Sequence, residues 1–200
     1  GLLGGFLIFS LIVAVAAALG VYRITGPGDL RGLPAALVAS AIFPALSEEI
    51  VFRGVLFRWI EEFGGSWVAL ILTSAFFGAG HLMNPSATTI AAVGIAFEAG
   101  VMLGAAYMLT RSLWLPIGLH AAWNFAQGEI YDIPVSGTNV HGLVDARLSG
   151  PPLLTGDGFG LEASLIAIVV ATLFGLWLLR LAIRKGELVQ PRWVRGLKLR

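Results

Sequence analysis

The chain has 200 residues, of which 57% are hydrophobic and only 12% are charged, with a formal net charge of +1. This composition is typical of an integral membrane protein, and the near-neutral charge argues against a nucleic-acid partner. Because there is no cysteine, disulfides, a thiolate nucleophile and a cysteine-based metal site are all excluded.

Six apolar segments follow one another, and about 20 apolar residues are enough for a helix to cross the hydrocarbon core. The first could also be a signal peptide, but no basic stretch precedes it and it is longer than an ordinary signal core. We therefore predict an all-α polytopic protein, a single membrane domain over 1–200 with an intramembrane polar site. The expected helices cover about 2–22, 33–57, 67–81, 88–109, 113–125 and 161–182.

The connecting segments predict an orientation. Residues 127–160 are rich in Gly, Pro, Asp and Ser, which indicates an extramembrane loop. The tail at 183–200 is basic, which places the C-terminus in the cytoplasm by the positive-inside rule. Six crossings then put the N-terminal end inside as well, although Arg23 and Arg31 on the outer side weigh against this. We expect membrane lipid as a partner.

Three ionisable residues, Glu48, Glu49 and Arg53, lie inside one of the most apolar runs. A single charge at the centre of a membrane helix costs roughly 2.5–3.5 kcal/mol, so three together need partners or a watery cavity. Glu49 and Arg53 are four residues apart, which favours an ion pair along one helix face. Glu48 lies about 100° away and is left free for another role.

His81, His120 and Asn124 are further polar residues at membrane depth. At about 1.5 Å per residue, Glu48, His81 and His120 lie within about a turn and a half of the same depth. His120 and Asn124 are four apart and share a helix face.

Two prolines accompany these residues, since Pro44 and Pro116 each stand four residues before a candidate, Glu48 and His120. A proline in a membrane helix frees a backbone carbonyl and bends the axis, which could open a cavity at that level. The alternative is that both are ordinary transmembrane prolines.

Two kinds of chemistry fit these residues. A desolvated glutamate beside an imidazole can act as a general base on water, while a His and Asn pair can donate hydrogen bonds to an oxyanion. That combination suits hydrolysis of a peptide bond. Alternatively, Glu48, His81, His120 and Asn124 could hold a divalent metal ion such as zinc with an activated water.

The ordered motifs Glu48-Glu49-xxx-Arg53, Phe77-xxx-His81 and His120-xxx-Asn124 resemble those of the CAAX protease and bacteriocin-processing (Abi) family of intramembrane proteases. This family includes the eukaryotic prenyl endopeptidase, and the resemblance covers about 35–125. It implies that Glu48 is the general base, His81 holds the water, His120 and Asn124 form the oxyanion hole, and Glu49 with Arg53 support the site. A glutamate-type mechanism needs no cofactor, although the family was long described as metal-dependent. The small size and Arg-rich tail resemble the family's bacterial members more than the eukaryotic enzyme, which implies a bacterial or archaeal plasma membrane and a protein or peptide substrate.

Some features fall outside this pattern. Glu98 stands where the family usually has an apolar or small residue. His141-xxx-Asp145 mimics the third motif but lies in the expected loop, so we expect it to be unrelated to the site.

Rival functions are a proton-coupled transporter or channel, in which an intramembrane Glu-His chain would carry protons, and a non-catalytic immunity or scaffold protein.

Overall fold

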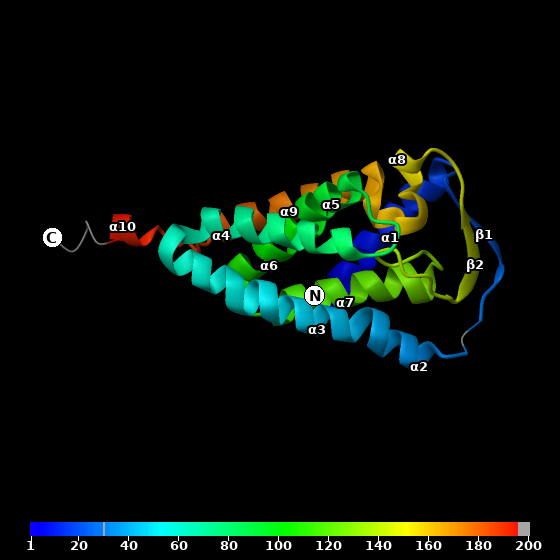
Figure 1. Cartoon of the computed structure of the whole chain (residues 1–200), viewed down its shortest axis with the longest axis horizontal. Helices are drawn as coiled ribbons and strands as arrows, with labels where there is room; N and C mark the ends of the chain where they lie inside the picture. The colour runs from blue at the N-terminus through cyan, green and yellow to red at the C-terminus, as the bar shows by residue number, and fades with distance from the viewer. Residues whose placement is uncertain (30, 196–200) are drawn as a thin grey trace.

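The computed structural model describes residues 1–29 and 31–195 and is mostly helical, at 73%. Its long helices run side by side along the longest axis of the molecule (Figure 1). A two-stranded ribbon lies at one end, which we call the ribbon end, and the chain leaves at the opposite end through α10 (Arg192–Arg195), the tail end. Lys198 and Arg200 of the predicted basic tail lie outside the described residues.

The longest apolar stretch, Leu33–Met83, is a helical hairpin. Its first rod comprises α2 (Leu33–Ala36), η1 (Leu37–Ile42), α3 (Phe43–Glu49) and η2 (Ile50–Phe57) and continues into the start of α4 (Arg58–Gly80). The chain reverses at Gly65, whose φ of 78° and ψ of 173° suit glycine alone. The returning rod ends in η3 (His81–Met83). Glu48 and His81 therefore lie on neighbouring rods of the hairpin.

Three further rods and α1 complete the bundle. One consists of α5 (Thr89–Ile95), η4 (Ala96–Gly100) and α6 (Val101–Thr110), another of α7 (Trp114–Phe125) and η5 (Ala126–Ile130), and the last is α9 (Leu165–Arg184). α1 (Leu2–Ala18) packs against α7, and α6 packs against α9. Short turns α8 (Pro152–Thr155), η6 (Asp157–Phe159) and η7 (Leu161–Ala163) precede α9.

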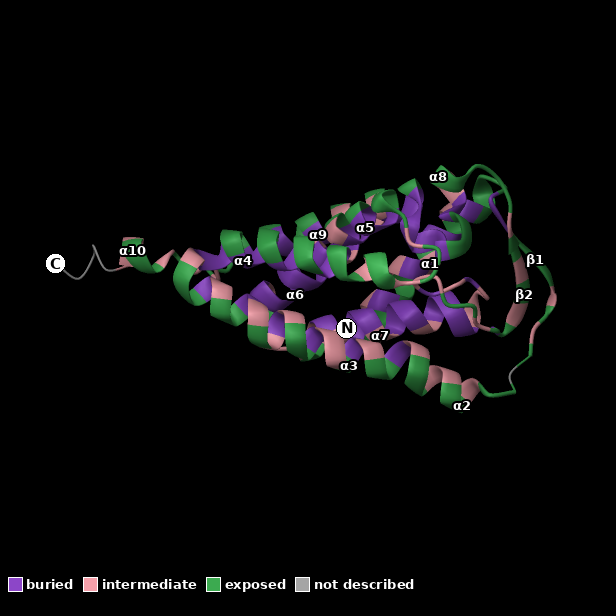
Figure 2. Cartoon of the chain, viewed as in Figure 1, coloured by how far each residue is buried: buried purple, intermediate pink, exposed green. Residues whose placement is uncertain are grey.

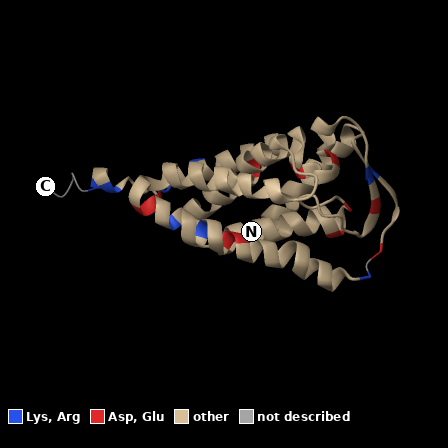
Figure 3. Ribbon diagram, in the orientation of Figure 1, with Lys and Arg blue, Asp and Glu red and all other residues tan. Residues whose placement is uncertain are grey.

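Apolar side chains cover both the inside and the outside of the bundle. Buried residues line the faces where helices meet, whereas the outward faces are exposed (Figure 2). Many exposed side chains are large and hydrophobic, such as Phe43, Ile71 and Leu173. Charged residues are sparse along the rods, and basic residues gather at the tail end (Figure 3). An apolar outer face is what contact with lipid requires.

Within the described residues, three segments combine the length and hydropathy needed to cross a membrane: Leu33–Met83, Thr89–Thr110 and Leu165–Arg184. Leu2–Ala18 is apolar but shorter. These segments support an integral membrane protein, whereas the count of six crossings and their orientation stay predictions.

The all-α prediction needs one correction, because β1 (Tyr22–Pro27) pairs antiparallel with β2 (Val144–Leu148). The first helix ends at Ala18 rather than near Tyr22, since Gly20 adopts a φ of 74° and the aromatic and β-branched residues that follow favour a strand. The ribbon joins the segment that contains Arg23 to the loop at 127–160, and both were expected on the outer side of the membrane. Two other boundaries also differ, since η5 extends the fifth helix to Ile130 and α9 starts at Leu165.

Candidate active site

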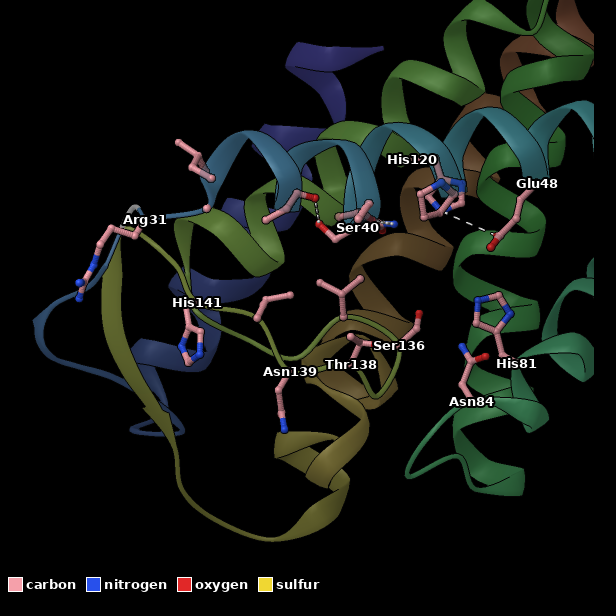
Figure 4. Close-up of a pocket in the computed structure, with 18 residues that line it drawn as sticks. Arg31, Ser40, Glu48, His81, Asn84, His120, Ser136, Thr138, Asn139 and His141 are labelled. Atoms are coloured by element: carbon pink, nitrogen blue, oxygen red, sulfur yellow. Dashed lines mark hydrogen bonds and ion pairs between the residues drawn. The ribbon is translucent and has the colours of Figure 1, made fainter.

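A cavity of about 470 Å³ lies between the first rod of the hairpin and the loop that follows η5. All four residues predicted to carry the chemistry, Glu48, His81, His120 and Asn124, line it. In Figure 4, Glu48, His81 and His120 gather at one end of the cavity, whereas Arg31 lies at the other. The sequence thus predicted which side chains the fold brings together.

The ion pair expected from the four-residue spacing is present. Arg53 Nη1 lies 2.9 Å from Glu49 Oε1, and both side chains are fully buried. Arg53 Nη2 donates to the carbonyl oxygens of Ala99 and Gly100 at 3.3 and 3.2 Å, and its guanidinium lies over the Phe77 ring. These contacts compensate the burial of a charge that would otherwise be very costly.

His120 bridges the two adjacent glutamates. Its Nδ1 lies 3.0 Å from Glu49 Oε1, and its Nε2 lies 4.0 Å from Glu48 Oε2. Because Glu49 is held by Arg53 and a carboxylate only accepts, Nδ1 carries the proton. In neutral His120, the Nε2 atom therefore carries a lone pair that faces Glu48. Nε2 donates a hydrogen bond only when the ring is protonated to an imidazolium.

Glu48 itself is left without a hydrogen-bond partner at Oε2, although this oxygen is buried. The 4.0 Å separation from His120 Nε2 is too long for a direct hydrogen bond. One water molecule can contact both atoms across such a gap. Glu49 Oε2 is also buried without a partner, but the Glu49 side chain is fully buried, whereas the Glu48 side chain is 33% exposed and lines the cavity. Glu48 is thus the carboxylate placed to accept a proton from a water in the cavity.

His81 is held in one orientation by its own helix. Its Nδ1 donates to the Phe77 carbonyl at 2.8 Å, and its ring packs against the Phe77 ring at a centroid distance of 4.8 Å. This contact leaves the Nε2 lone pair free at the cavity wall. The spacing of the second motif therefore has a physical reason, since Phe77 both orients His81 and covers Arg53.

Asn124 is fixed by a backbone carbonyl that a proline leaves free. Pro44 has no N–H, so the carbonyl of Ser40 four residues earlier lacks that helical donor. Asn124 Nδ2 donates to this carbonyl at 3.0 Å, which ties α7 to the first rod. The Ser40 hydroxyl in turn bonds Glu129 on η5. One part of the effect expected of Pro44, a backbone carbonyl without its helical donor, is thus used by Asn124, and the second N–H of Asn124 remains for a ligand.

Several polar residues of the bundle lie on segments of widened, π-type helix, whereas Glu49 lies on α3 and His120 and Asn124 lie on α7. Such segments expose backbone groups and recur at functional sites. Here they hold Ser40 in η1, Arg53 in η2, Glu98 in η4, and Gln127 with Glu129 in η5. No simple sequence pattern marks these segments, so Ser40 and Glu129 could not be placed in advance.

A small chamber of about 20 Å³ lies behind the two histidines and is lined by Glu98 and Glu162 among others. Both carboxylate oxygens of Glu98 are buried without a hydrogen-bond partner in the described part of the chain. The chamber has room for about one water molecule. Glu98 therefore faces the back of the site rather than lipid.

Glu162 was missed by sequence reasoning, because it precedes the last helix in a stretch assigned to that helix. It is 3% exposed, and its Oε1 accepts from the backbone N–H and the hydroxyl of Ser136, at 2.6 and 2.8 Å. Burial raises the pKa of the Glu162 carboxyl, and the bonds from Ser136 act against this rise. Glu162 thereby pins the loop after η5 to the bundle.

That loop is part of the site, which the sequence did not indicate. Between Val135 and His141 it supplies one wall of the cavity. The expectation that His141 is unrelated to the site is wrong as to position, since His141 lines the cavity, whereas Asp145 lies on β2. A Gly/Pro-rich stretch folds back here because its turns are fixed by tertiary contacts that a local pattern does not reveal.

The described residues contain no group of three or more His, Asp or Glu side chains arranged to hold a metal ion. His81 Nε2 and His120 Nε2 have the lone pairs that a metal would need, but the donors do not converge as a set. The described residues therefore hold no ready-made set of this kind, and the metal alternative stays a prediction.

Comparison with known proteins supports the resemblance seen in the motifs. Residues 30–126 match the model of the family described as type II CAAX prenyl endopeptidase Rce1-like. No curated protein and no solved structure matched the chain. The matched range contains Glu48, Glu49, Arg53, His81, His120 and Asn124. The domain at residues 30–126 therefore belongs to the Rce1-like branch of the CAAX protease and bacteriocin-processing family of intramembrane proteases.

Proposed function

We propose that this protein is an intramembrane endopeptidase that hydrolyses a peptide bond with a water activated by Glu48. The observation that carries the proposal is the unpaired Glu48 Oε2, buried in the cavity wall 4.0 Å from His120 Nε2. Glu49 binds Arg53 and His120 through Oε1 and its side chain is fully buried, whereas Glu48 lines the cavity, so the adjacent glutamates have different tasks. One carboxylate orients the imidazole, while the other remains available as a base.

The reaction proceeds in two proton transfers. Glu48 takes a proton from water as the water oxygen bonds to the scissile carbonyl carbon, and the carbonyl oxygen becomes an oxyanion. The protonated Glu48 then gives that proton to the leaving amine as the C–N bond breaks. His81 Nε2 accepts a hydrogen bond from the attacking water and so helps to orient it.

The oxyanion is stabilised by donors from α7. Asn124 offers the N–H that its bond to Ser40 leaves free. His120 donates from Nε2 as an imidazolium, since its Nδ1–H is held by Glu49. Losing one such donor typically lowers kcat about 10²- to 10³-fold. This assignment predicts that His120 must be protonated for the oxyanion to form.

Substrate class and location follow from the fold as proposals. The cavity is sunk in a bundle with an apolar outer face, so a peptide or protein segment at the membrane is the expected substrate. The C-terminus is proposed to be cytoplasmic, in a bacterial or archaeal plasma membrane. A proton-coupled transporter uses similar residues, but the fixed His120–Glu49 contact and the family match favour hydrolysis.

The test compares the purified wild type with Glu48→Gln and Glu48→Asp in detergent, on a randomised decapeptide mixture read by mass spectrometry, with and without a chelator. We expect cleavage by the wild type, loss of about 10²- to 10⁴-fold in Glu48→Gln, and no effect of the chelator. Equal cleavage by Glu48→Gln, or no cleavage by the wild type, would overturn the proposal. Loss with the chelator and rescue by zinc would transfer the reaction to metal catalysis.

A further inference from the structure

The loop that forms one wall of the cavity contains a short stretch whose backbone groups make no hydrogen bonds within the described part of the chain. In the described part of the chain, neither the N–H nor the C=O groups of Asn139, Val140 and His141 make a hydrogen bond to protein. All three residues line the cavity that holds Glu48. Unpaired backbone groups beside a substrate cavity are a template for pairing with a second chain.

The stretch is held firmly on its N-terminal side. Val135 and Thr138 exchange backbone hydrogen bonds around Ser136 and Gly137, which have φ values of 47° and 83°, as a tight hairpin turn requires. Ser136 is bound by Glu162, and Gly137 N–H donates to the carbonyl of Phe159 at 2.8 Å. A side chain at Gly137 would collide with the Pro85 carbonyl, so the turn is packed against the segment that follows His81.

It is held on its C-terminal side as well. Gly142 N–H donates to Asp132, and Leu143 N–H donates to the Glu129 carbonyl at 2.7 Å. Leu143 C=O accepts from Gly28. Hydrogen-bonded residues thus flank the three residues on both sides. The lack of backbone hydrogen bonds at Asn139–His141 is therefore not explained by a weakly held loop.

The side chains leave the edge accessible. Val140 is partly buried, and a Cβ added at Gly128 would lie 3.0 Å from Val140 Cγ2, which shows that Val140 packs onto η5. Asn139 and His141 on either side are exposed. In Figure 4 the stretch runs along the cavity, from the end near Ser136 toward the end near Arg31, opposite the rod that carries Ser40 and Glu48.

We propose that Asn139–His141 is the substrate-binding edge, which pairs with the extended backbone of the peptide as an added β-strand. This inference rests on the proposed function and adds how the substrate is held. Main-chain pairing gives affinity that depends little on substrate sequence, while the side chains of alternate residues face opposite sides. It also explains why the loop is pinned, because a fixed edge costs less ordering on binding.

The experiment uses a decapeptide that the wild type cleaves and Glu48→Gln does not. Each backbone amide of that peptide is N-methylated in turn, and kcat/KM is measured, with matched ester substitutions that remove the N–H and add less bulk. Amides that pair with the edge are expected to lose about three- to tenfold per hydrogen bond, at every second position on one side of the cut. The intervening positions are expected to change little.

Variants of the enzyme provide a second readout. Asn139→Pro and His141→Pro each remove an N–H group that points one way from the stretch, and Val140→Pro removes the one that points the other way. Either the pair of variants at 139 and 141 or the variant at 140 is expected to raise KM more than the other. Alanine at the same position is the matched control, because it keeps the backbone N–H.

Uniform sensitivity, or none, in the methylated series would overturn the inference while leaving the Glu48-dependent cleavage in place. If the wild type cleaves no decapeptide, the proposed function falls, and the inference falls with it.

Discussion

His120 Nδ1 lies 3.0 Å from Glu49 Oε1, and this contact joins α7 to the rod that carries Glu48. The same Glu49 oxygen is 2.9 Å from Arg53 Nη1. One buried carboxylate therefore fixes the ring of His120 and neutralises a buried guanidinium. The fold and the chemistry of the site depend on the same atom, so variants must be chosen to separate the two roles.

Arg53→Met is expected to be more damaging than the double variant Glu49→Gln/Arg53→Met. The single change leaves Glu49 buried without its cation, which costs about 3–5 kcal/mol, whereas the double change removes both charges. Thermal unfolding in detergent should therefore show partial recovery of stability in the double variant. Peptide cleavage should stay low in both, because neither holds His120 through an Arg-paired carboxylate. A double variant no more stable than Arg53→Met would contradict the pairing.

Asn124→Ala is expected to lower kcat about 10²- to 10³-fold with little change in KM, because the lost donor acts on the oxyanion. It also leaves the Ser40 carbonyl without its side-chain donor, which should cost about 1–3 kcal/mol of stability. Steady-state kinetics and thermal unfolding measure the two effects separately. An effect on KM alone would assign Asn124 to substrate binding instead.

Glu162 should make stability depend on pH. Burial raises its pKa above the ordinary value of 4.5, so its stabilising contribution is complete below the unfolded-state pKa and is lost as the pH rises through the folded-state pKa. The groups around it are Ser136, Glu98, His81 and Trp123. Glu162→Gln removes this titration, so its melting temperature should fall less than that of the wild type as the pH is raised from 4.5. Parallel curves for the two proteins would show that Glu162 does not titrate in this way.

The sequence predicted the centre of the site better than its surroundings. Helical spacing placed Glu49 with Arg53, and His120 with Asn124, because residues four apart share a face whatever the tertiary structure. Comparable depth along the rods placed Glu48 near both histidines.

Two parts of the surroundings were not predicted. The wall formed by Ser136 to His141, and its anchor Glu162, depend on contacts between segments more than 20 residues apart in the sequence. The β1–β2 ribbon likewise pairs Tyr22 with Leu148, a contact that local composition does not encode.

Gly65 sets the reversal of the hairpin, so Gly65→Ala should be strongly destabilising. Its φ of 78° with ψ of 173° costs a non-glycine residue about 1–3 kcal/mol. An added Cβ would also lie 2.8 Å from the carbonyl oxygen of Val189, which bonds Ser66 N–H and so docks the tail on the turn. Gly80→Ala in the same helix is the matched control, because a Cβ there meets nothing within 4 Å.

The control should gain roughly 0.5–1 kcal/mol, since alanine is the better helix former. Thermal unfolding of both variants in detergent measures the contrast, and limited proteolysis after Val189 reports whether the tail has left the turn. A Gly65→Ala protein as stable as the wild type would mean that the reversal does not require this backbone conformation. The two arms of the hairpin, and with them the distance between Glu48 and His81, would then be set by packing alone.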